Sequence, residues 1–126
     1  MTITEKDIAK EQPAPVSTDN SKVVWPELVK DIKKKTGITE EQKEKMFGIL
    51  KTRISKGLIS YGTCLKTFNG RDAQADAVQE FADLLFYLKQ LKMEKEAVGN
   101  LDGALLDGAV LDASIQLFAR FVSDAH

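Results

Sequence analysis

Histidine and cysteine are almost absent from this chain. Of its 126 residues one is histidine, His126 at the very end, and one is cysteine, Cys64. Chain ends are usually mobile, so His126 is poorly placed for catalysis or metal binding. This scarcity excludes Ser-His-Asp and Cys-His catalysis, an ordinary zinc site and an internal disulfide. The near absence of cysteine is typical of a protein from a reducing, cytoplasmic environment.

Long apolar runs and an excess of either charge are also lacking. Lys plus Arg is 18 and Asp plus Glu is 19, which gives a formal net charge of -1. No apolar run approaches the roughly 18 residues of a membrane span, and the N-terminus has acids but no apolar signal-peptide core. We therefore expect no membrane partner and no nucleic-acid partner. If the protein is an enzyme, it must use carboxylates, lysine, arginine and a hard metal ion such as Mg²⁺ for catalysis.

The length predicts one domain preceded by a tail. Residues 1–22 are polar and contain prolines, with little to bury, so we expect a flexible N-terminal tail. Residues 23–126 show no sustained strand pattern and read as an all-α domain of about four helices.

Two helices are predicted in the first half of this domain. The first is expected over Trp25–Gly37, with proline at its start and glycine at its end. The second begins with the capping box of Thr39 and Gln42 and is expected to end at Gly57. Residues 58–70 contain two glycines and predict a loop, with a short extended piece at its beginning.

Two longer helices are predicted in the second half. The third spans residues 71–96, and the fourth follows the break at Gly99 and Asn100. The fourth is apolar on two sides, which favours packing of one side against another subunit. The expected core face of the third helix consists of Ala77, Phe81, Leu84, Leu85, Leu88 and Leu91.

Acidic residues gather on another side of the third helix. Asp72, Asp76, Glu80 and Asp83 lie there without a lysine at helical spacing. Like charges four residues apart cost about 0.2–0.5 kcal/mol per pair, and a position near the helix start relieves only the first two acids. The strip is either a solvated polar face or a cation site, because acids on adjacent turns can share Mg²⁺.

One stretch on this helix resembles a known family. "EFADLLFYL" (Glu80–Leu88) resembles the E-x-x-D helix of the MazG-like all-α nucleoside triphosphate pyrophosphohydrolases. The longer run Ser55–Gln90 is similar to small phage and bacterial proteins of this kind, in which a Tyr-Gly segment precedes N-G-R-D-A and D-A-x-x-E-x-x-D. Residues Trp25–Ile32 are loosely similar as well.

The resemblance implies a fold, an activity and a location. It implies a MazG-like helical bundle completed by oligomerisation, as a dimer or tetramer, in a bacterial cell or phage-infected host. It also implies hydrolysis of a nucleoside triphosphate to the monophosphate and pyrophosphate. Magnesium, or manganese in its place, would be held by Glu80 and Asp83, with Asp76 as a third ligand.

The sequence departs from the family in the second acidic pair. That E-x-x-E pair usually precedes E-x-x-D more closely, whereas nothing acidic lies between Glu44 and Asp72. Three alternatives remain open. Glu41 and Glu44 complete the metal site, or Asp76, alone or with Asp72, completes it from the same helix, or the protein has the fold without the catalysis.

Basic and polar residues before the acidic helix are candidates for substrate binding. Arg71 can fork onto two phosphate oxygens, while Lys56 and Lys66 would act as point charges. Tyr61 either stacks on a base or fills the core, and Asn69 either binds substrate or caps the helix. The competing reading is a catalytically inactive helical oligomer for assembly or for binding a partner or nucleotide.

Overall fold

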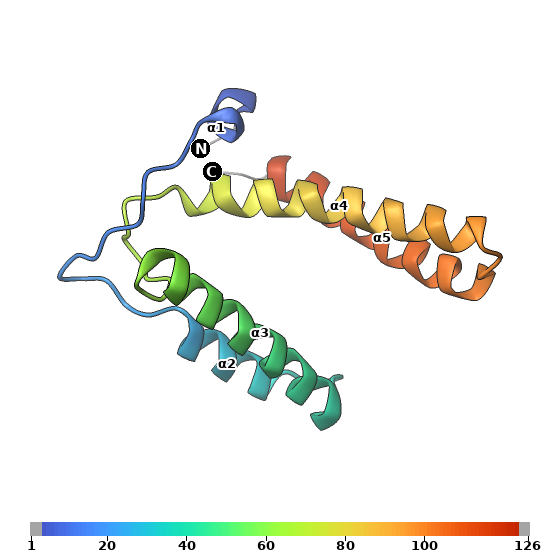
Figure 1. Ribbon diagram of the computed structural model, residues 1–126, viewed down its shortest axis with the longest axis horizontal. Coiled ribbons are helices and arrows are strands. Elements are labelled where there is room, and N and C mark those ends of the chain that lie inside the picture. The colour runs from blue at the N-terminus through green and yellow to red at the C-terminus, as the bar shows by residue number, and fades with distance from the viewer. Residues whose placement is uncertain (1–3, 124–126) are drawn as a thin grey trace. The chain divides into compact units, whose positions relative to one another are not determined.

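The protein is helical throughout the part that the structure describes. The computed structural model describes residues 4–123, so His126 lies outside it. Within that range there are five helices and, in place of strands, one isolated antiparallel bridge between Val23 and Lys66 (Figure 1). This confirms the all-α prediction. The chain forms two compact units, one of Met1–Glu11 with Asp72–His126 and one of Gln12–Arg71.

The helices of residues 4–123 were also compared with the requirements of a membrane span. None of them combines the length and the apolar character needed to cross a bilayer.

The first unit is built on an antiparallel pair of long helices. Helix α4 (Ala73–Ala97) and helix α5 (Leu101–Ser123) lie side by side along most of their length (Figure 1). Gly99 has a φ of 79°, a left-handed conformation that favours glycine and turns the chain back. Asn100 then accepts the backbone N–H of Gly103 at 3.0 Å, which satisfies a free donor at the start of α5.

The fully buried apolar side chains of α4 and α5 are mostly small. The buried apolar residues of the described chain are all in this pair, and they are Ala75, Val78, Ala104 and Leu111. Gly108 admits the stem of Lys92, because a Cβ there would lie 3.2 Å from the lysine Cε. Small residues allow close approach of the helices, but each buries little apolar area.

Larger groups close the two ends of the pair. Near the start of α4, the ring of Phe81 packs against Phe118 and Phe121, with centroids 5.3 Å and 6.4 Å apart. Near the turn, Lys95 Nζ and Asp107 Oδ2 form an ion pair of 2.7 Å, well shielded on the aspartate side. These contacts fix the register of the two helices.

A short helix that the sequence did not predict completes this unit. Helix α1 (Glu5–Ala9) begins with a capping box in which Thr4 and Asp7 bond reciprocally. Hydrogen bonds from the Thr4 backbone N–H and, to a smaller extent, from the Thr4 hydroxyl hold the pKa of the Asp7 carboxyl below its ordinary value. The side chain of Gln79 on α4 donates to the carbonyl of Ile8 at 2.6 Å. A helical conformation does not by itself measure mobility, so the flexibility of residues 1–22 stays a prediction.

The second unit contains helix α2 (Trp25–Lys34) and helix α3 (Glu40–Tyr61), which pack against each other. The predicted capping box at the start of α3 is confirmed: Thr39 Oγ1 accepts from Gln42 N at 3.1 Å, and Gln42 Oε1 accepts from Thr39 N at 2.8 Å. Lys43 is buried and donates from Nζ to the Lys33 carbonyl at 2.8 Å. It therefore satisfies a carbonyl at the C-terminal end of α2.

Two predictions about helices are wrong. Helix α3 passes through Gly57 and ends at Gly62, whose φ of 71° is left-handed, so residues 58–61 are helical rather than extended. A glycine inside a helix costs only about 1 kcal/mol, which is not enough to stop it. On α4, Ala77, Leu84 and Leu91 were expected in the core but are exposed, because α5 covers a neighbouring sector of the helix.

The packing between α4 and α5 should determine much of the free energy of unfolding of the first unit. Leu111 is 8% exposed, so Leu111→Ala should lower the free energy of unfolding by about 2–4 kcal/mol through lost apolar contact and a cavity. Leu105→Ala, on the same helix and 76% exposed, is the matched control and should change it by less than about 0.5 kcal/mol. Urea unfolding followed by circular dichroism measures both, and equal losses would contradict this packing.

Candidate functional site

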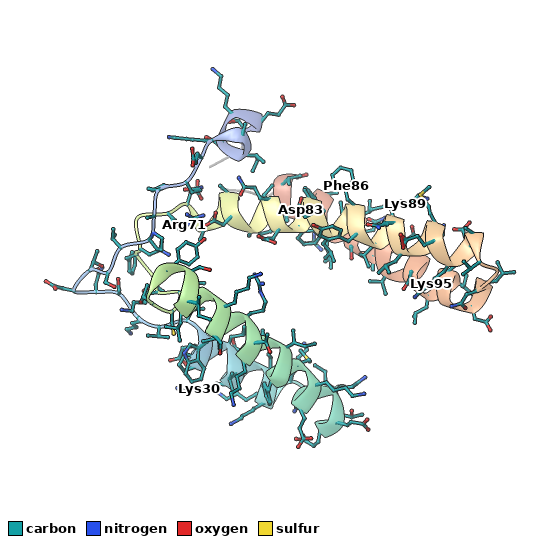
Figure 2. The ribbon with its side chains drawn as sticks, viewed as in Figure 1. Lys30, Arg71, Asp83, Phe86, Lys89 and Lys95 are labelled. Atoms are coloured by element: carbon teal, nitrogen blue, oxygen red, sulfur yellow. The ribbon has the colours of Figure 1, made fainter. Side chains whose placement is uncertain are left out.

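The acidic strip lies along one side of a single unbroken helix. Helix α4 starts at Ala73, so Asp76, Glu80 and Asp83 stand on successive turns of it (Asp83 is labelled in Figure 2). Glu80 and Asp83 are exposed, and neither has a hydrogen-bond or ion-pair partner among residues 4–123. Asp76 is half-buried. Two carboxylates on adjacent turns are therefore free to bind a cation.

Asp72 has a different task from the other acids. It is the N-cap of α4, and its Oδ1 accepts the backbone N–H of Ala75 at 3.1 Å. This bond satisfies one of the free donors at the helix start. The geometry thus gives Asp72 a structural role in starting the helix that carries the strip.

The carboxylates of the strip fit a magnesium ion held by two side chains together with water and phosphates. They do not fit a magnesium ion held by protein side chains alone. Within residues 4–123, no three or more His, Cys, Asp or Glu side chains are grouped so that they could hold a metal ion. An all-protein cage is therefore not formed by those residues. Magnesium, however, commonly uses one or two carboxylates and fills its other positions with water and substrate phosphates. Glu80 and Asp83 supply the hard oxygen donors for this second mode.

The second predicted acidic pair lies on α3, in the other compact unit. Glu41 and Glu44 are both exposed, in the first turns of the helix and one turn apart. Glu41 Oε1 lies 3.5 Å from Lys45 Nζ, an exposed pair with a small energetic contribution. The structure thus places Glu41 and Glu44 together and leaves their assignment as metal ligands a prediction.

The loop before α4 is held by one buried asparagine. The backbone carbonyl of Asn69 accepts the N–H of Val16 at 2.9 Å, and its side-chain Oδ1 accepts the N–H of Arg71 at 3.1 Å. Because the α4 cap is Asp72, Asn69 does not cap the helix. Its neighbour Phe68 has a φ of 51°, a left-handed conformation unusual for an aromatic residue, and is exposed.

Two basic residues of this loop, Lys66 and Arg71, are candidates for phosphate binding. Both are hydrogen-bonded to residues 13–17, which precede α2. Lys66 Nζ donates to Ser17 Oγ at 3.0 Å, and Arg71 Nη1 donates to the carbonyl of Pro13 at 2.7 Å. Lys56 and Tyr61 lie on the last two turns of α3, both exposed. Tyr61 therefore does not fill the core of its unit.

The sequence did not predict that residues 16–24 are hydrogen-bonded to the loop before α4. The Lys22 carbonyl accepts from Thr67 N at 2.9 Å, and Val24 N donates to the Leu65 carbonyl at 3.0 Å. Thr18 Oγ1 also donates to the Phe68 carbonyl at 3.3 Å. The turn-forming side chains of "STDNS" were a local signal for an ordered turn. Nothing local signals a partner about fifty residues away in the chain.

Comparison with known proteins adds no assignment. No family model, curated protein or solved structure matches this chain.

The buried asparagine yields a direct test of the loop. Asn69→Ala removes the acceptor of the Arg71 N–H and should lower the free energy of unfolding by about 1–3 kcal/mol. Asn20→Ala is the matched control, since Asn20 is exposed and its Oδ1 accepts the exposed hydroxyl of Thr18. Its effect should stay below about 0.5 kcal/mol. Chemical unfolding of the two variants in parallel measures both; a neutral Asn69→Ala would show that this bond does not hold the loop.

Proposed function

We propose that the protein is a magnesium-dependent nucleoside triphosphate pyrophosphohydrolase, which converts its substrate to the monophosphate and pyrophosphate. One observation supports this most directly: Glu80 and Asp83 stand exposed on adjacent turns of α4 with no basic partner among residues 4–123. Solvated helix faces usually mix the two signs of charge, because opposite charges at this spacing stabilise a helix. The resemblance of Ser55–Gln90 to the MazG-like enzymes gives the reaction class.

The roles of the acids follow from their chemistry. Glu80 and Asp83 would hold magnesium, with Asp76 as a third ligand directly or through water. When bound, the ion supplies neutralising charge for the phosphates and makes the attacking water more acidic. A carboxylate of the strip, Glu80 in this proposal, accepts the proton of that water. The water oxygen bonds to the α-phosphorus, the bond from that phosphorus to the bridging oxygen breaks, and pyrophosphate leaves.

The substrate is strongly anionic, so cations must meet its phosphates. Arg71, Lys66 and Lys56 are the proposed contacts. The anchoring of Arg71 to Pro13 and of Lys66 to Ser17 supports this role, since a held side chain loses less entropy on binding than a free one. Tyr61 is exposed at the end of α3 and is the proposed stacking surface for a base.

A second candidate function has its own support. The protein would be a catalytically inactive helical oligomer that serves assembly or binds a partner or nucleotide. No grouping of three metal-binding side chains occurs among residues 4–123, and large apolar side chains are exposed on α4 and α5. Exposed apolar surface of this kind is typical of association.

Ligand-dependent melting and product release distinguish the two candidates. With Mg²⁺ and a non-hydrolysable deoxynucleoside triphosphate, the midpoint of thermal unfolding should rise, because the ligand binds only the folded state. Release of pyrophosphate across a nucleotide panel should fall at least about 100-fold in Glu80→Gln and in Asp83→Asn, which lose a magnesium ligand.

The control is a carboxylate on the neighbouring helix. Asp112 is an exposed acid of α5, and Asp112→Asn should leave pyrophosphate release within about twofold of wild type. If wild type and all three variants release pyrophosphate alike at background, the enzyme proposal is wrong. A rise in melting temperature without turnover would favour the nucleotide-binding alternative.

A further inference from the structure

The two compact units carry opposite net charges. Residues 12–71 contain 12 lysines and arginines and six aspartates and glutamates, which gives this unit a formal net charge of +6. Residues 1–11 and 72–126 contain six of the basic and 13 of the acidic residues, a formal net charge of -7. The charge of the whole chain, from which no nucleic-acid partner was expected, therefore hides two large and opposite values. Such asymmetry is typical of a chain in which one part binds a polyanion.

The basic residues of the second unit concentrate in its C-terminal part. Six bases and no acid lie between Glu44 and Asp72. Three of these bases, Lys51, Arg53 and Lys56, are exposed on α3, and none of the three has a hydrogen-bond or ion-pair partner among residues 4–123. The helix dipole favours a base in the last turn of a helix, but the last turn of α3 contains none. Local structure therefore does not explain why these bases are gathered here.

Two of the bases lie on one side of α3. At about 100° per residue, Arg53 and Lys56 are about 60° apart around the helix, and Lys45 falls in the same sector. Like charges at this spacing repel each other, and Glu41 offsets only Lys45, through an exposed ion pair of 3.5 Å. This side of α3 therefore has a charge that an anionic partner would neutralise.

Exposed aromatic side chains follow these bases along the chain. Tyr61 ends α3 and Phe68 lies in the next loop, and they are 61% and 68% exposed. Phe68 also has a φ of 51°, a left-handed conformation that costs an aromatic residue energy. Its carbonyl accepts a hydrogen bond from Thr18 Oγ1 at 3.3 Å, which helps to hold this conformation. The unit thus keeps a strained aromatic residue with little stabilisation from burial.

We propose that the α2–α3 unit binds single-stranded nucleic acid, with Arg53 and Lys56 on phosphates and Phe68 stacked on a base. A single strand offers a phosphate at every nucleotide and the open face of each base, which matches bases and exposed rings in one unit. A lipid surface offers anionic headgroups without such faces. The proposal rests on the charge and contacts of this unit alone and requires neither the acidic strip nor a metal ion.

The salt dependence of binding follows from the number of phosphate contacts. For a single strand, each contact adds about -0.7 to the slope of log K against log salt concentration. Contacts from Lys45, Arg53 and Lys56 predict a slope of about -2. Binding without sequence preference should have a dissociation constant in the micromolar range at low salt.

Fluorescence anisotropy with the full chain tests the basic side of α3. The probes are an oligothymidylate and an oligouridylate of about 20 nucleotides, without a terminal triphosphate, in about 50 mM salt without divalent cations. Binding of either strand supports the proposal, and the tighter one identifies the sugar. Arg53→Gln with Lys56→Gln should weaken binding at least about tenfold and lower the steepness of the salt slope by about 1.4.

The matched control removes the same charge from the acidic unit. Lys6 and Lys89 are exposed lysines of that unit, and Lys6→Gln with Lys89→Gln should leave the dissociation constant within about twofold of wild type. Equal weakening by the two double variants would overturn the proposal, because binding would then follow the charge of the whole chain.

Removal of the exposed ring tests stacking. Phe68→Asn should weaken oligothymidylate binding about tenfold and leave binding of an abasic strand of equal length unchanged, since asparagine accepts a left-handed φ but does not stack. Phe86→Asn is the control, because Phe86 is 75% exposed on α4 and should affect neither strand (Phe86 is labelled in Figure 2). Equal affinity of wild type for the abasic strand would overturn the proposed stacking.

Two further results would contradict the proposal as a whole. Absence of wild-type binding to both strands would show that the bases are neutralised within the protein, by acids of the same chain or of another copy. Tighter binding to vesicles of anionic lipid than to either strand would favour a membrane surface instead. Because the strands carry no triphosphate and the buffer no metal ion, each of these results is independent of pyrophosphate release.

Discussion

The packing of α4 against α5 is the constraint on which the first unit and its acidic strip depend. On α5, Gly108 leaves room for the stem of Lys92, and Ala104 and Leu111 are buried, so the two long helices lie together along most of their length. The pair keeps α4 continuous from Ala73 to Ala97, and only a continuous helix keeps carboxylates seven residues apart on one side. The ion pair of Lys95 with Asp107 and the Phe81 cluster then hold the register.

The same packing explains why acids and apolar residues share the outer surface. Leu84 and Leu91 on α4 lie outside the sector that packs on α5, and both are exposed. Glu80, about one turn before Leu84, is exposed as well. The carboxylates of the proposed cation site therefore share the exposed surface of α4 with apolar side chains.

Sequence patterns predicted the helices, which depend on neighbouring residues. They did not predict the hydrogen bonds between residues far apart in the sequence. Strong periodicity and the capping box at Thr39 located α3, α4 and α5 well, because these depend on neighbours within a few residues. Gly57 was wrongly expected to end α3, since one glycine inside a helix costs only about 1 kcal/mol and does not by itself stop it. The site is similar: the acids of α4 follow from spacing, whereas Asn69 is buried by contacts with residues far away in sequence.

The most direct test of this account is where a divalent cation binds. In amide spectra of the full chain, substoichiometric Mn²⁺ broadens resonances close to its site. The account expects broadening centred on Glu80 and Asp83 of α4, and its loss in Glu80→Gln with Asp83→Asn. Broadening that is absent from α4, or centred on another part of the chain, would contradict the claim that these two carboxylates form a cation site.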